Sequence, residues 1–214
     1  EGDVFRGLTS HAMQEWTALS STAFFQRLVT EGKLVHTEPI AQDALPPSVS
    51  REQWAIILKH HTIPFISYPY EWSFSQLKDA ALATLEIQKS ALNHGMSLKD
   101  ASAYNVQFYK GKPVFIDTLS FEKYQDKKPW AAYQQFCRFF IVPLALMSRI
   151  DIRMNQLLRI YLDGIPLDLA SSSLSWKTCF SPTLLMHIHL HAKYQKKHSK
   201  EILNTPAKQT MGIK

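Results

Sequence analysis

Apolar residues recur at helical spacing in the middle of this 214-residue chain and predict one long amphipathic helix over 73–94. Ser73 and Gln76 have the S-x-x-Q spacing of a capping box, which marks the start of a helix, and Gly95 stands where a C′ glycine commonly ends one. The residues expected to face the core along this helix are Leu77, Ala80, Ala81, Leu85, Gln88 and Leu92.

Short β-branched and aromatic runs before this helix predict strands. They lie at 3–8, 34–37, 54–60 and 65–68, and we expect the last two to form an antiparallel pair around Pro64. Between the first two, the apolar positions of 11–29 fit one broken helix or two short ones, with Thr9 or Ser10 as the N-cap. The proline-containing stretch 38–50 is expected to be a loop.

After the long helix, the pattern predicts a loop over 97–105 and then a β-hairpin around the turn Lys110-Gly111-Lys112. The rest of the chain is predicted to be helical, beginning with a long helix over 130–148 that bends at Pro143. Further helical pieces are expected at 151–162, 166–172 and 182–202, followed by a frayed end or linker over 205–214. Strands first and helices afterwards indicate an α+β fold.

The amino-acid composition and the distribution of charge disfavour some classes of function. Hydrophobic residues make up 45% and charged residues 20%, which is ordinary globular usage, and the 7 glycines disfavour a Gly-rich phosphate loop. The net charge of +6 comes largely from lysines in the last quarter, where a solvated helix end is favoured over a nucleic-acid or anionic-lipid site. The aromatic residues fall at apolar positions rather than among these lysines, which disfavours nucleic acid as a partner.

The chain is expected to be soluble and cytoplasmic. It shows no signal-peptide pattern, and its longest apolar run is far shorter than the roughly 20 residues that span a bilayer, so we expect no membrane partner. Cys137 and Cys179 each lie in an apolar run and are expected to be buried free thiols in a reducing compartment. His187 and His191 share a helix face, as two zinc ligands would, but packed or surface histidines are favoured.

Three polar residues form the candidate site. Asp100 is followed five residues later by Asn105, and Asp117 ends the second strand of the expected hairpin, which would bring it beside Asn105. Protein kinases use this order of groups: the first Asp accepts the acceptor-hydroxyl proton, and the Asn and second Asp hold metal ions. Asp100 is thus the catalytic candidate, and Asn105 and Asp117 are candidate Mg²⁺ ligands. The alternative is that the three residues merely cap a turn and end strands.

Several longer segments carry a family resemblance, namely 60–74, 100–105, 115–122, Pro129-Trp130 and 143–147. Through them the chain, from about Val4 to Lys197, resembles the N-terminal, kinase-like region of bacterial class I S-adenosylmethionine-dependent methyltransferases of the nodulation-protein NoeA-related family. No strand followed by a G-x-G turn, as the methyltransferase domain requires, occurs in this sequence.

The resemblance implies a protein-kinase-like fold. Residues 1–68 would form a small or truncated N-lobe without a Gly-rich loop, 69–204 a mostly helical C-lobe, and 205–214 a tail or linker to a missing domain. Arg6 would stand in place of the phosphate-binding lysine, with Glu15 or Glu31 as its acidic partner. The segment from Ser67 to Glu71 would be the hinge that holds an adenine, which makes Ser67, Tyr68, Tyr70 and Glu71 candidate cofactor-binding residues.

Three functional hypotheses remain open. The first is a kinase-like accessory domain that binds a nucleotide or a small-molecule substrate and serves a methyltransferase domain in cis. S-adenosylmethionine (SAM) would then be bound only by that C-terminal domain. The second is an active phosphotransferase that uses ATP and Mg²⁺. The third is a binding-only pseudokinase or basic interaction module, which the missing Gly-rich loop and the lysines near the C-terminus favour. Around the site, Leu98-Lys99 precedes Asp100 where kinases have His-Arg, and Thr118-Leu119 follows Asp117 where they have Phe-Gly.

Overall fold

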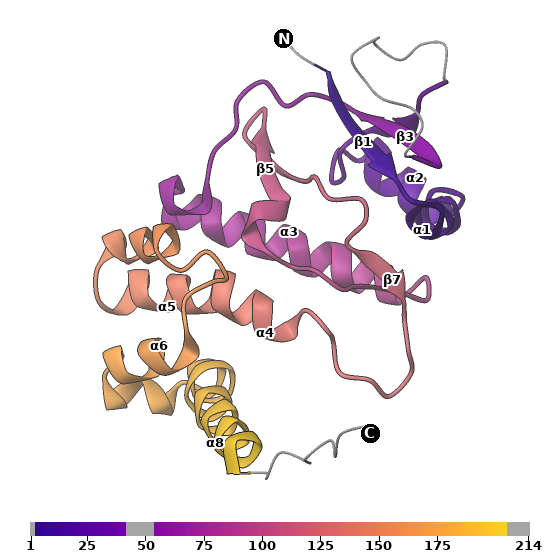
Figure 1. Cartoon of the computed structure of the whole chain (residues 1–214). Coiled ribbons are helices and arrows are strands. Elements are labelled where there is room, and N and C mark those ends of the chain that lie inside the picture. The colour runs from indigo at the N-terminus through magenta and orange to yellow at the C-terminus, as the bar shows by residue number, and fades with distance from the viewer. Residues whose placement is uncertain (1–2, 42–53, 205–214) are drawn as a thin grey trace, which may run out of the picture.

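The computed structural model describes residues 3–41 and 54–204, with side chains to 197. It confirms the α+β class. A small antiparallel sheet and two helices form the N-terminal part, the long helix α3 (Phe74–Leu92) crosses the middle, and the remaining helices pack beyond it (Figure 1). The predicted loop residues 42–50 and the predicted tail 205–214 lie outside the described residues.

The N-terminal sheet consists of β1 (Val4–Leu8), β3 (Ile56–His60) and β2 (Thr37–Pro39), in the order β1-β3-β2. All neighbours are antiparallel, and the register places Val4 opposite His60. Because β3 is paired along both edges, the predicted pairing of 54–60 with 65–68 is wrong. The segment 65–68 is not a strand: Pro64 and Pro69 flank it, and proline cannot donate to a sheet ladder.

Two short helices follow β1, as one of the two sequence alternatives predicted. They are α1 (Ser10–Ser20) and α2 (Ala23–Thr30), and the hydroxyls of Thr9 and Thr22 cap their N-termini. The predicted strand over 34–37 is wrong, since strand pairing with β3 begins only at Thr37.

The residues just before β2 instead contact the hairpin in the second half of the chain. Leu34 forms an isolated parallel bridge with Phe115, and the Val35 amide donates to the Phe115 carbonyl at 2.9 Å. This bridge joins the N-terminal part to the segment that ends at Asp117.

Helix α3 confirms the capping prediction at both ends. The Ser73 hydroxyl accepts from the Gln76 amide at 3.2 Å, and the Gln76 side chain accepts from the Ser73 amide at 3.0 Å. Gly95 has φ +68°, the left-handed conformation that suits glycine at a helix end.

The predicted buried face of α3 is correct at four positions and wrong at Leu85 and Leu92, which are 40% and 41% exposed. Each lies one residue, about 100°, round the helix from its true core-facing neighbour. The buried residues are Leu77, Ala80, Ala81, Thr84, Ile87, Gln88 and Ala91.

Two strand pairs follow α3 and surround the candidate loop. The hairpin of β5 (Val106–Tyr109) and β6 (Lys112–Phe115) is confirmed, with positive φ at Lys110 and Gly111, as in a type I′ turn. The other pair joins β4 (Met96–Leu98) to β7 (Phe121–Lys123), so the predicted loop over 97–105 is wrong in its first two residues, and its last three form the 3₁₀ helix Ala103–Asn105.

The long helix predicted from Trp130 begins later, as α4 (Tyr133–Phe136), and continues through a π turn (Cys137–Ile141) into α5 (Val142–Arg149). The Val142 amide donates to Cys137, five residues back, directly before Pro143, which has no amide hydrogen. The remaining helical elements are the 3₁₀ helix Ile152–Arg159, α6 (Leu167–Ser173), the 3₁₀ helix Trp176–Phe180, α7 (Pro182–Leu184), the π turn Leu185–Leu190 and α8 (His191–Asn204).

One hydrophobic core runs through these parts, from Leu8 and Phe24 through Leu98 and Phe140 to Ile188. Cys137 is buried in it as predicted. The prediction for Cys179 is wrong, since this thiol is exposed on the outer side of the Trp176–Phe180 helix. No helix in 3–41 or 54–204 is long and apolar enough to cross a membrane.

Candidate functional site

A cleft of about 430 Å³ lies between the N-terminal sheet and the residues that follow α3. It brings together three residues that the sequence singled out, one from β1 and two from the loops around the hairpin: Arg6, Asn105 and Asp117. Apolar side chains complete the cleft, among them Val4, Val35, Ile63, Ile66 and Ile116. A concave apolar site with a few convergent polar groups is the usual form of a small-molecule binding site.

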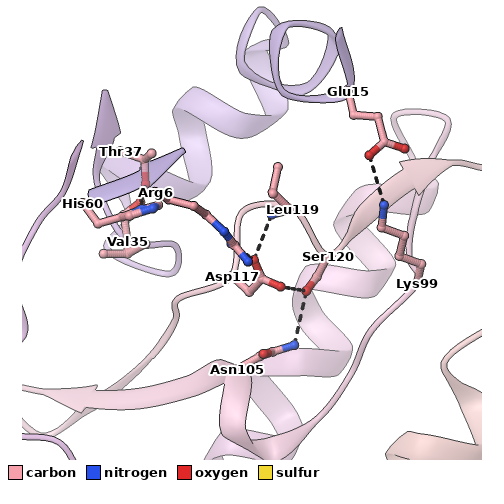
Figure 2. Close-up of polar contacts among 10 residues, drawn as sticks. All are labelled: Arg6, Glu15, Val35, Thr37, His60, Lys99, Asn105, Asp117, Leu119 and Ser120. Atoms are coloured by element: carbon pink, nitrogen blue, oxygen red, sulfur yellow. Dashed lines mark hydrogen bonds and ion pairs between the residues drawn. The ribbon is translucent and has the colours of Figure 1, made fainter. Parts of the chain in front are cut away.

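A continuous chain of polar contacts links the three residues (Figure 2). Arg6 forms an ion pair with the Asp117 carboxylate. The other carboxylate oxygen of Asp117 accepts from the Ser120 hydroxyl at 2.8 Å, and that hydroxyl accepts from the Asn105 side-chain amide at 3.2 Å. The side-chain oxygen of Asn105, Oδ1, has no hydrogen-bond partner among the described residues, so it is available to a ligand.

The local backbone explains this convergence. The Ile116 amide donates to the Asn105 backbone carbonyl at 2.7 Å, which fixes the start of the hairpin beside its end. The Leu119 amide donates to the Asp117 carboxylate at 3.1 Å, so the chain turns directly after this residue. The hairpin therefore places Asp117 beside Asn105, as the sequence predicted.

Burial and charge act in opposite directions on Asp117. Burial would raise the pKa of its carboxyl, but hydrogen bonds from Arg6 and Ser120, the Arg6 charge and the Leu119 amide together hold the pKa below the ordinary value of 3.8. Asp117 is therefore ionised at neutral pH.

His60 lies at the same cleft and is kept neutral. Its pKa is lowered from 6.5 mainly by burial and also by the Arg6 charge, while Asp117 acts in the opposite direction. Its Nδ1 is 2.8 Å from the Thr37 hydroxyl. Sequence reasoning treated His60 only as a strand end. In the folded sheet His60 lies opposite Val4, and Val4 is two residues before Arg6 in β1. This strand register would have pointed to His60, but the sequence alone does not define it.

Asp100 lines a second pocket, of about 490 Å³, rather than the first. One Asp100 oxygen accepts from the Ser102 amide at 2.9 Å. Asn105 lines both pockets and thus stands between Asp100 and Asp117. Asp100 therefore shares the second pocket with Asn105 and does not line the cleft that contains Arg6 and Asp117.

The predicted hinge residues Ser67, Tyr68, Tyr70 and Glu71 are not among the described residues that line the first cleft. Two of them serve local structure: the Ser67 hydroxyl accepts from the Trp72 indole at 2.9 Å, and Glu71 accepts from the Tyr68 amide at 2.8 Å. The neighbouring residues Ile63 and Ile66 face the cleft instead.

Neither predicted acidic partner of Arg6 pairs with it, so that prediction is wrong. Glu15 pairs with Lys99 at 3.2 Å, and Glu31 pairs with Lys33 at 2.8 Å. The partner of Arg6 is Asp117, because β1 lines the cleft at Arg6 and Asp117 lines the same cleft from the end of the hairpin.

Two histidines near the C-terminus, His187 and His189, contact hydroxyl groups of the protein, whereas the His191 ring stacks on Tyr133 and its buried Nδ1 has no hydrogen-bond partner in the described structure. His187 Nδ1 is 2.6 Å from the Tyr133 hydroxyl, and the His189 ring lies 2.8 Å from both Ser171 and Thr178. Over the described residues, no group of three or more His, Cys, Asp or Glu side chains is arranged to hold a metal ion. Any metal at Asn105 and Asp117 would therefore need further ligands from a nucleotide or from water.

No protein-family model matches the chain. The chain is similar to the nodulation protein NoeA of Rhizobium meliloti (strain 1021), with 40% identity over 195 residues, which is 90% of this chain. The match covers 40% of NoeA, so the chain spans about two-fifths of the length of that relative.

Proposed function

We propose that this chain is a kinase-like domain that binds a nucleotide in the cleft formed by Arg6, Asn105 and Asp117. The observation that carries the proposal is the meeting of these residues, far apart in the sequence, in one cleft with apolar walls, while Asp100 lines the adjoining pocket. In phosphotransferases of this type, a basic residue on an N-terminal strand, a catalytic-loop Asp and Asn, and a later Asp surround the nucleotide phosphates.

The residues fit Mg²⁺ by donor chemistry. The carboxylate of Asp117 is ionised, and the side-chain oxygen of Asn105 lacks a partner in the described structure; hard oxygen donors of this kind suit Mg²⁺. Bound there, the ion would neutralise phosphate charge. Arg6 would leave Asp117 and donate to a phosphate oxygen, which its planar guanidinium can contact through two N–H groups.

The apolar part of the cleft would hold the base. Ile63 and Ile66 follow β3 and lie on the same cleft as Arg6, so they replace Ser67, Tyr68, Tyr70 and Glu71 as the best candidates for contact with an adenine. Exposed apolar side chains in this segment support the idea, since Ile66 is 51% exposed without a ligand.

The chain would serve a larger protein, as an accessory domain beside a methyltransferase domain in cis that binds SAM. The support is the match to only 40% of NoeA together with the resemblance noted in the sequence. A small molecule is the proposed substrate of the whole protein.

Calorimetric titration with ATP in the presence and absence of Mg²⁺ tests the proposal. We expect Mg²⁺-dependent binding to the wild-type chain and its loss in Asp117→Asn. Asp79→Asn is the matched control, because Asp79 is an exposed carboxylate on α3, away from the cleft. Absence of ATP binding to a folded wild-type chain would contradict the proposal.

A second candidate function is phosphoryl transfer, favoured by the position of Asn105 between the two pockets. Asp100 has one carboxylate oxygen without a described partner, which would accept the proton of an acceptor hydroxyl in the second pocket. Transfer of labelled phosphate that is lost in Asp100→Asn, with ATP binding retained, would establish this role. Binding without transfer to any acceptor would leave the third hypothesis, a pseudokinase.

A further inference from the structure

The pocket beside Asp100 is more polar than the first cleft and carries a specific mixture of groups. Its lining includes the amides of Gln134 and Gln135 and the carboxylates of Asp100 and Asp163. It also includes the guanidinium of Arg138, which is held by a hydrogen bond of 2.9 Å from Nη2 to the Gly164 carbonyl.

Several of these groups have unused hydrogen-bonding capacity in the described structure. The Gln135 carbonyl oxygen accepts from the Ala101 amide at 2.6 Å, which leaves its NH₂ group as a donor. The side chains of Gln134 and Asp163 are exposed and form no hydrogen bond or ion pair with any described residue. Donors and acceptors thus stand side by side around one pocket.

The lining carries charges of both signs, so a charged ligand would meet a like charge as well as an opposite one, whereas a neutral ligand would not. Asp100 and Asp163 would repel an anion, and Arg138 would repel a cation. Lys99, the other cation of the pocket, is paired with Glu15 at 3.2 Å. Hydroxyl groups both donate and accept without carrying a charge, so they match this lining best.

One side of the pocket is apolar. Leu162 lines it and is 65% exposed, which leaves an apolar surface for the C–H face of a sugar ring. The volume of about 490 Å³ falls in the range of small-molecule sites, which is about 300–1,000 Å³.

We propose that this pocket binds a neutral saccharide, oriented by Gln134, Gln135 and Asp163, with one hydroxyl directed at Asp100. The idea that the saccharide hydroxyl at Asp100 is the phosphoryl acceptor rests on the proposed function. Binding itself requires no nucleotide.

Saturation-transfer NMR on the whole chain without nucleotide tests this inference. The probes are glucose, galactose and their neutral disaccharides, compared with glucuronate as the anionic probe and glucosamine as the cationic probe. We expect transfer to at least one neutral sugar and weaker transfer to both charged sugars. Preference for glucuronate or glucosamine, or no transfer to any neutral sugar, would overturn the inference.

Two variants locate the binding. Gln134→Ala and Asp163→Ala remove exposed polar side chains and should each weaken the affinity about 5-fold, the effect of one lost hydrogen bond. Gln14→Ala on α1 is the matched control, since it removes an exposed amide that does not line the pocket, and it should change nothing. Equal affinities in all three variants would show that the sugar binds elsewhere and would overturn the assignment.

Nucleotide binding is measured on the same samples by calorimetry, so that the two proposals fail separately. ATP binding without sugar binding would overturn the saccharide site alone. Sugar binding without ATP binding would support the pocket as a saccharide site and contradict the kinase-like proposal.

Discussion

The guanidinium of Arg6 forms an ion pair with the carboxylate of Asp117, although 111 positions separate them in the chain. One residue comes from the middle of β1 and the other from the first turn after β6, so the pair connects the N-terminal sheet to the hairpin across the cleft. Both groups that we propose for phosphate and metal binding are therefore engaged with each other in the ligand-free protein.

The first prediction concerns the energy of this pair. A double-mutant cycle with Arg6→Gln and Asp117→Asn should give a coupling free energy of about 1 kcal/mol, measured by urea unfolding at pH 7. The value is modest because the Arg6 side chain is 41% exposed, which screens the charge.

The exposed pair of Lys99 and Glu15 is the matched control, and its coupling should be about 0.5 kcal/mol or less. Equal coupling in the two cycles would show that the cleft pair contributes no more than a surface contact. Folding lowers the pKa of Asp117 below 3.8. Its contribution to the free energy of unfolding is therefore present above pH 3.8 and is lost as the pH falls through the lower pKa of the folded state.

The second prediction concerns pH and His60. Burial and the Arg6 charge lower the pKa of His60 below 6.5, so the unfolded chain binds more protons than the folded one as the pH falls below that value. The free energy of unfolding should therefore decrease between pH 7 and pH 5, with a slope of at most about 1.4 kcal/mol per pH unit from this group.

His60→Asn should flatten this dependence while retaining a polar atom near the Thr37 hydroxyl. The measurement is urea unfolding of both proteins at several pH values. The pKa of His191 is also lowered, mainly by burial, but its effect is the same in both proteins and cancels in their difference. Identical slopes would exclude His60 as the source.

The parts of this fold that sequence predicted correctly are those with local causes. The capping box at Ser73, the glycine at 95 and the turn at Lys110-Gly111 each depend on a few adjacent residues. The same hairpin places Asp117 beside Asn105. The proximity of these two residues of the candidate site could therefore be predicted from the local sequence.

The contacts that sequence missed depend on distant strand pairing. From charge alone, Glu15 or Glu31 could be the ion-pair partner of Arg6. The actual partner is Asp117, because the N-terminal part of the chain packs against the hairpin that ends at Asp117. The three-residue strands β4 and β7 are too short to show alternation, and their pairing was not predicted. The predicted hinge placed Glu71 at the cleft, but the Glu71 carboxylate instead accepts a hydrogen bond from the Tyr68 amide in a local turn.

The third prediction distinguishes the two thiols. Cys137 is buried, and burial raises its pKa to about 11, so about 0.1% of it would be thiolate at pH 8 even with solvent access. Cys179 is exposed. We therefore expect one fast equivalent of reaction with a disulfide reagent in the native protein and two in denaturant.

Substitution identifies the fast thiol. Cys179→Ser should remove the fast reaction, and Cys137→Ser should leave it unchanged. Two fast equivalents from the folded wild-type protein would show that the core around Cys137 opens readily, contrary to its complete burial.

The last prediction concerns Gly164, which supports the wall of the proposed saccharide pocket. Its φ of +84° is unfavourable for other residues, and a Cβ atom built there would lie 2.7 Å from the Arg138 Cβ atom. Gly164→Ala therefore combines backbone strain with overpacking and should lower the free energy of unfolding by about 2–4 kcal/mol. Urea unfolding of the variant gives this value directly.

Gly95→Ala separates the two causes, because Gly95 has φ +68° but no atom within 4 Å of a built Cβ. It should cost only the backbone strain, about 1–2 kcal/mol. The Ile165 amide donates to the Arg138 carbonyl at 3.1 Å, so displacement of Gly164 would also move Arg138, and the pocket should change shape. Equal losses in the two variants would show that the packing of Gly164 against Arg138 adds nothing to stability.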